Sequence, residues 1–294
     1  AGEVNFSTTE VYKATTTHLA QGTSVVTFSK NAALELNTNF TTETNGTGQI
    51  KLSAHDRTFK GAVGTDAKRI GNIHLMSDKT ITFDQANAKV YVNTITTEVA
   101  NQGKLALTAD GIELYASVGD AKAFSKVLIG NAIGAVTVKL KDNINLTLND
   151  GLILANGGNF DDIVELYAGA KITGKVTSGN AAKGIISVKG DATITKGIDS
   201  NGAQLINQIR FDAANTLTLG KNISTGDNQI KTQNGLNFLQ DGTLLFSDNA
   251  NVVLDKATVV AVGANGVGTI NADAVLTGNK ITVAGQVGDV NVAN

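Results

Sequence analysis

Apolar and polar residues alternate along most of the chain, in runs of four or five positions. The apolar positions are mainly Val, Ile and Leu, and Thr often stands between them. A period of two places the apolar side chains on one face of an extended chain, which is typical of β-strands. The pattern therefore predicts an all-β protein. The clearest predicted strands are Ser24–Phe28, Lys79–Phe83, Val136–Leu140, Ile144–Leu148, Thr216–Leu219 and Lys280–Val283.

Gly, Asn and Asp separate these strands every few residues. These residue types tolerate the left-handed or tight backbone that turns require. We expect turns at Ala109–Gly111, Asn149–Gly151 and Lys221–Asn222. One segment, Asp120–Leu128, is compatible with a short helix, because Asp120 is a residue type that caps helix N-termini.

The strands and turns group into circuits of about 20–24 residues, a repeat length typical of solenoids. Two architectures compete: tandem β-sandwich domains and a right-handed parallel β-helix. β-Sandwiches usually bury an aromatic anchor, whereas this chain has no Trp, no Pro and only 5% aromatic residues. In a β-helix each strand bonds to both neighbouring turns, so a proline would remove a donor. We favour one β-helical domain over residues 1–294, with an N-terminal cap at about residues 1–21.

The amino-acid composition argues against several classes of function. The 294 residues include 24 Lys and Arg and 26 Asp and Glu, a net charge of −2. No positive surplus is present to neutralise phosphates, so nucleic acid is a poor partner. The absence of Cys excludes disulfides, zinc–thiolate sites and a cysteine nucleophile. It also suits a secreted bacterial protein that crosses the oxidising periplasm.

Two features of the sequence are candidate metal sites, the histidines and one glycine-rich segment. His18, His55 and His74 do not stand in the spacings that suggest zinc. Asn156–Asp162 resembles half of a calcium-binding nonapeptide, but one glycine is replaced and the motif does not recur nine residues on. We interpret this segment as a polar turn. We expect no metal and no cofactor.

An enzyme that acts on polysaccharides would need two carboxylates at a set distance. Asp161 with Asp162 and Asp110 with Glu113 are candidate pairs, but the many carboxylates make such pairs unspecific. A sugar groove would also use aromatic platforms, and the chain has four Tyr and no Trp. We expect no catalytic residues.

Four elements follow one another in the first third of the chain. They are Gly61–Thr65, of the form Gly-x-Val-Gly-Thr; Ile70–Ile73, of the form Ile-x-x-Ile; Thr80–Phe83; and Gly103–Leu107, of the form Gly-x-Leu-x-Leu. This succession resembles the passenger region of the rickettsial surface cell antigen and outer membrane protein autotransporters. The similarity is strongest over residues 59–108 and fainter over 203–224 and 243–285.

The resemblance implies a β-helical passenger on the outer membrane surface of a Gram-negative bacterium. It implies adhesion to a host-cell surface protein or, alternatively, self-association in a structural stalk or surface layer. We expect the chain to be a fragment of a longer protein whose C-terminal translocator barrel is absent here. The resemblance assigns no binding residue by its number in this sequence.

Overall fold

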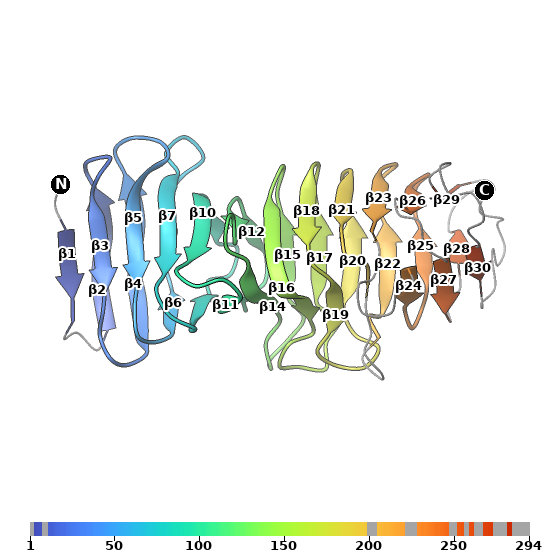
Figure 1. The fold of residues 1–294 in the computed structure, drawn as a ribbon, viewed down its shortest axis with the longest axis horizontal. Coiled ribbons are helices and arrows are strands. Elements are labelled where there is room, and N and C mark those ends of the chain that lie inside the picture. The colour runs from blue at the N-terminus through green and yellow to red at the C-terminus, as the bar shows by residue number, and fades with distance from the viewer. Residues whose placement is uncertain are drawn as a thin grey trace. The chain divides into compact units, whose positions relative to one another are not determined.

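The computed structural model describes residues 3–7, 11–198, 205–220, 228–246, 252–255, 259–261, 267–272 and 281–283. These residues form strands β1 to β30, and no helix occurs among them. The strands pair in parallel with strands of the next turn, which confirms the predicted parallel β-helix. Figure 1 shows successive strands of each sheet lying side by side.

Contacts within the chain define two compact units. Unit 1 comprises Ala1–Leu128 and Ile144–Asp150, and unit 2 comprises Ile129–Asn143 and Gly151–Asn294. The single continuous domain that the sequence suggested stays a prediction.

Unit 1 has three sheet faces. The first face contains β1 (Glu3–Phe6), β3 (Val25–Phe28), β5 (Thr47–Leu52), β7 (Ile70–Leu75), β10 (Val92–Thr97), β13 (Ser117–Val118) and the start of β16 (Asn145–Leu154). The second contains β2 (Val11–Leu19), β4 (Leu34–Thr42), β6 (Arg57–Phe59), β8 (Thr80–Phe83), β11 (Gln102–Leu107) and β14 (Phe124–Ile129). The third contains β9 (Lys89–Val90) and β12 (Ile112–Leu114).

Unit 2 repeats this plan. One face contains β15 (Thr137–Leu140), β17 (Ile163–Leu166), β20 (Ile185–Val188), β22 (Gln208–Phe211), β25 (Leu236–Phe238) and β28 (Val259–Ala261). A second contains β18 (Ala170–Thr173), β21 (Ala192–Ile194), β23 (Thr216–Leu219), β26 (Thr243–Phe246) and β29 (Thr269–Ala272). Further pairings join the end of β16 to β19 (Val176–Ser178), and β24 (Asn228–Lys231) to β27 (Val252–Asp255) and β30 (Ile281–Val283).

Equivalent residues stack in rows inside each unit. In unit 1, Val26 pairs with Ile50, Ile50 with Ile73, and Ile73 with Ile95. All four side chains are at most 3% exposed. A second row is aromatic, because the ring of Phe59 stacks on that of Phe83 with centroids 4.9 Å apart. Burial of these rows is the main favourable contribution to folding.

Arg57 is the largest side chain that is fully buried in the described core. Its guanidinium nitrogens Nη1 and Nη2 donate five hydrogen bonds at 2.8–3.2 Å to backbone carbonyls, those of Phe28, Lys30, Ala32, Ser53 and Asp56. Burial lowers the pKa of Arg57 and the nearby Asp56 carboxylate opposes the shift, but a guanidinium stays protonated at neutral pH. Arg57 therefore ties together two turns at a corner of the solenoid.

Two local expectations were wrong. Asp120–Leu128 is not helical, because its second half belongs to β14, which pairs with β11. Asn149–Gly151 is not a turn, because β16 continues through it. The N-terminal cap at about residues 1–21 stays a prediction; its described part contains β2, which pairs with β4 over most of its length. In β14 and β16, pairing with the neighbouring turn outweighs the local preference of the sequence.

Candidate functional site

The outer face of unit 1 carries a row of polar side chains that bond from one turn to the next. Lys51 on β5 pairs in register with His74 on β7, and His74 pairs with Thr96 on β10. His74 Nδ1 lies 2.9 Å from Thr96 Oγ1, and His74 Nε2 lies 2.9 Å from an oxygen of Glu98. Lys122 donates through Nζ to the backbone carbonyl of Glu98. We call these five residues the histidine ladder.

The charges of the histidine ladder reinforce one another. The hydrogen bond from His74, together with the positive charges of Lys122, His74 and Lys51, holds the pKa of Glu98 below its usual value. Glu98 is therefore ionised at neutral pH and faces solvent. The ladder presents a zwitterionic hydrogen-bonding strip across several turns.

The same relationship occurs at the first turn. His18 Nδ1 lies 2.9 Å from Thr41 Oγ1, and His18 Nε2 lies 3.3 Å from a carboxylate oxygen of Glu43. Both histidines thus contact a Thr and a Glu one turn ahead, a recurrence that the sequence analysis missed. The signal was present in the spacing, because Thr follows His by 22 or 23 residues in the two cases. His55 differs, since its Nε2 bonds to Asn31 Oδ1 at 2.7 Å.

A second polar row lies on the neighbouring face of unit 1. Lys60 forms ion pairs with Asp84 and, at 3.9 Å, with Glu35, and Thr108 donates to Asp84 at 2.8 Å. Burial raises the pKa of Asp84, but the hydrogen bonds from Lys60 and Thr108 outweigh it and lower the pKa overall. Polar rows that join successive turns are therefore a general feature of the outer surface of this unit.

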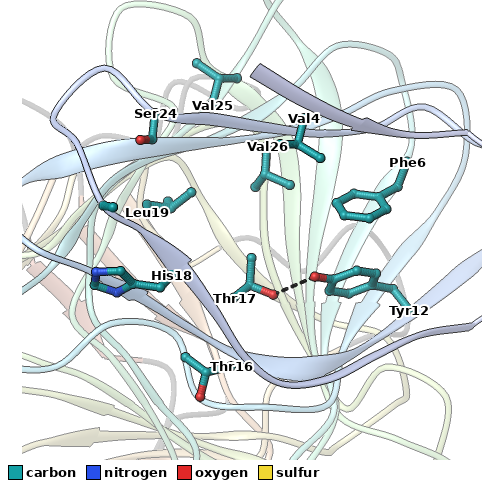
Figure 2. Close-up of a pocket in the computed structure, with 11 residues that line it drawn as sticks. Val4, Phe6, Tyr12, Thr16, Thr17, His18, Leu19, Ser24, Val25 and Val26 are labelled. Atoms are coloured by element: carbon teal, nitrogen blue, oxygen red, sulfur yellow. Dashed lines mark hydrogen bonds between the residues drawn. The ribbon is translucent and has the colours of Figure 1, made fainter. Parts of the chain in front are cut away.

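The first turn of unit 1 leaves an apolar cavity of about 410 Å³ beside β1 and β2. Figure 2 shows Phe6 and Tyr12 side by side at one end of it, with Val4 and Val26 above. The Tyr12 hydroxyl hydrogen-bonds to Thr17 at 3.0 Å, and Val4 is 54% exposed. Among the described residues, β1 pairs only with β3 and β2 only with β4. The first turn therefore exposes both interior apolar surface and strand edges.

The candidate calcium segment Asn156–Asp162 is a loop of unit 2 that ends just before β17. Its two carboxylates have different environments. Asp161 accepts a hydrogen bond from Asn207 at 2.9 Å and pairs with Lys183 at 3.6 Å. Asp162 is fully buried and accepts the backbone N–H of Val136. The two side chains therefore do not face a common solvent-accessible space as a carboxylate pair.

The other candidate carboxylate pair is Asp110 and Glu113. Asp110 lies in the turn before β12, and Glu113 lies on β12. Glu113 accepts a hydrogen bond from the Tyr115 hydroxyl at 2.8 Å and lies 3.8 Å from Lys89 Nζ. Tyr115 in turn stacks on Tyr91 with ring centroids 4.3 Å apart. Glu113 thus belongs to a network of tyrosines and a lysine.

Comparisons with other proteins gave no relatives. No protein-family model matches the chain, and neither the curated proteins nor the solved structures contain a match. Within the residues that the structure describes, no group of three or more His, Cys, Asp or Glu side chains is placed to hold a metal ion. No helix in the described ranges is long and apolar enough to cross a membrane.

Proposed function

We propose that this chain is a surface-exposed passenger fragment of an autotransporter and that it adheres to a host-cell surface protein. The histidine ladder is the observation that carries this proposal. The His74 and Lys122 side chains are held in place by bonds to a neighbouring turn, so they lose little conformational entropy when they meet a partner. The β-solenoid fold and the resemblance over residues 59–108 agree with a passenger at the bacterial outer membrane surface.

The proposed contact is electrostatic and hydrogen-bonded. Lys51 and Lys122 carry positive charge on either side of the Glu98 carboxylate, so a partner surface with alternating charges would pair with the strip. Such complementarity contributes mainly to the rate and specificity of association. Binding should therefore weaken as salt is added, because exposed charges are screened within about 8 Å at physiological ionic strength.

The test is a titration of labelled protein onto host cells, competed with unlabelled protein. We expect saturable, competable binding, reduced at least several-fold in the double variant Lys51→Glu and Lys122→Glu. The matched control is Lys171→Glu on β18, an exposed lysine outside the ladder, which should bind as the wild type does. Absence of saturable binding would contradict adhesion, and equal binding of the ladder variant would contradict the assigned surface.

The second candidate is a structural stalk or a self-associating surface-layer element. The exposed Val4 and Val11 side chains and the apolar cavity beside β1 and β2 favour it, because exposed apolar surface is typical of sites of association. Sedimentation at increasing concentration would show association that Val4→Lys weakens. A monomer at high concentration, together with saturable cell binding, would favour adhesion instead.

A further inference from the structure

Residues 130–136 form a loop of unit 2 that ends where β15 begins. Asn131 Oδ1 accepts the backbone N–H groups of Ile133 at 2.7 Å and Gly134 at 3.0 Å. The Ile133 side chain at the tip is 90% exposed, the most exposed large apolar side chain of the described residues. At the end of the loop the Val136 N–H donates to Asp162 Oδ1 at 2.7 Å. The loop is thus fastened to the next turn through this carboxyl group and through the Val136 carbonyl, which accepts the Ile163 N–H at 2.8 Å.

That carboxyl group has an unusual environment. Asp162 is 0% exposed, and its Oδ2 atom has no hydrogen-bond partner. Oδ2 packs against Gly130, where an added Cβ would lie only 2.1 Å away. The backbone carbonyl of Asp162 accepts the Ile185 N–H at 2.8 Å, which fixes the residue to the following turn. Ionisation of this buried carboxyl group carries a desolvation cost, which the N–H groups of Val136 and Ala155 offset only in part.

The charged groups around Asp162 do not offset this cost. Asp161 is adjacent, and its negative charge opposes ionisation of Asp162. Lys183, on the next turn, forms its ion pair with Asp161 at 3.6 Å. No ion pair to Asp162 is present among the described residues. The elements packed against Asp162 therefore favour its neutral form.

We propose that Asp162 is a proton-controlled clasp, which holds the loop 130–136 closed when it is protonated and loosens the loop when it is ionised. The neighbouring loop is fixed independently, because Asn180 Nδ2 donates to the carbonyls of Ala155 at 2.8 Å and Gly158 at 2.6 Å. Hydration of the ionised carboxylate therefore requires movement of the loop 130–136. The device goes beyond the proposed function, since it controls how the exposed Ile133 is presented.

The direction of the pH dependence follows from linkage. Burial raises the pKa of Asp162 to about 6 from 3.8, and Asp161 adds to the shift, whereas the N–H groups of Val136 and Ala155 oppose it. The closed loop thus binds the proton more tightly than the open loop does. Its extra stability is fully present below about pH 4 and is lost as pH rises through about 6. Two pKa units correspond to about a hundredfold change in the opening equilibrium.

The test is hydrogen exchange of the Ile133–Val136 amides between pH 4 and pH 7, corrected for the intrinsic rate. In the wild type we expect the opening equilibrium to rise by up to about a hundredfold over this range. Asp162→Asn keeps an acceptor for Val136 and cannot ionise, so its opening should not depend on pH. Asp161→Asn is the matched control. Its opening equilibrium should still change with pH, with a midpoint at a slightly lower pH than in the wild type.

A second measurement does not depend on any variant. The side-chain carboxyl carbon of Asp162, followed by NMR in the wild type, should titrate near pH 6, and a midpoint below pH 4 would overturn the proposal. The proposal would also be overturned if the corrected exchange rates of the wild type were equal at pH 4 and pH 7. It would be overturned likewise if opening in Asp162→Asn still depended on pH.

Discussion

The Nε2 atom of His74 lies 2.9 Å from Oε2 of Glu98, which follows it by 24 residues and lies beyond the paired strand of the next turn. His18 and Glu43 have the same relationship. Successive turns of unit 1 are thus joined on the outside by side chains, as well as by the backbone pairing of the strands and by the core.

The carboxyl pKa of Glu98 depends first on His74. In the wild type, NMR titration should give a carboxyl pKa below the ordinary value of 4.5. His74→Phe removes the hydrogen bond, so the pKa should rise toward that value. Lys122→Met should raise it less. An unchanged Glu98 titration in His74→Phe would show that the hydrogen bond is not maintained in solution.

The Lys60–Asp84 pair should make unit 1 sensitive to acid. The folded-state pKa of Asp84 is lowered, so its contribution to stability is present above its ordinary pKa of 3.8 and is lost as pH falls through the folded value. Asp84→Asn should therefore flatten the dependence of Tm on pH between about 2 and 5. Asp66→Asn, whose carboxylate is 78% exposed, is the control and should leave the slope unchanged.

Arg57→Met should destabilise the fold severely. The substitution leaves five backbone carbonyls without their donor, and loss of such a buried charged network costs roughly 3 kcal/mol or more. Arg57→Lys keeps the charge but offers three donors on a flexible stem, so its loss should be smaller. Chemical denaturation measures both variants, and a wild-type midpoint for Arg57→Met would refute the structural role.

Two glycines offer a matched comparison of backbone requirements. Gly64 has a φ of +68°, and an added Cβ would lie 2.2 Å from the Tyr91 carbonyl oxygen. A Cβ added at Gly134 would meet no atom of another part of the chain within 4 Å. Gly64→Ala should cost more than about 1 kcal/mol, because both the left-handed backbone and the backbone contact are unfavourable. Gly134→Ala should be nearly neutral. Similar thermal unfolding of the two variants would contradict this assignment.

The local alternation of apolar and polar residues was sufficient to predict many of the strands. The alternation at Lys79–Phe83 corresponds to β8, with Ile81 and Phe83 buried and the Thr side chains outward. The lack of proline agrees with strands that pair on both sides. The prediction of a short helix at Asp120–Leu128 was wrong. The Ala and Lys residues of its first half favour a helix locally, but Phe124 and Val127 are buried in the stacked turns.

The sequence by itself determined many of the side chains that enter the core, because a period of two fixes the inward face of a regularly alternating strand such as β8 or β17. Only the tertiary structure decided which outer side chains meet. Val25 pairs with a residue 24 positions further on, whereas Val118 pairs with one 28 positions further on. Since turn lengths vary, sequence distance alone does not bring His74 to Glu98 or the Val136 N–H to Asp162. Strand register makes those contacts, and it is set by the whole stack of turns.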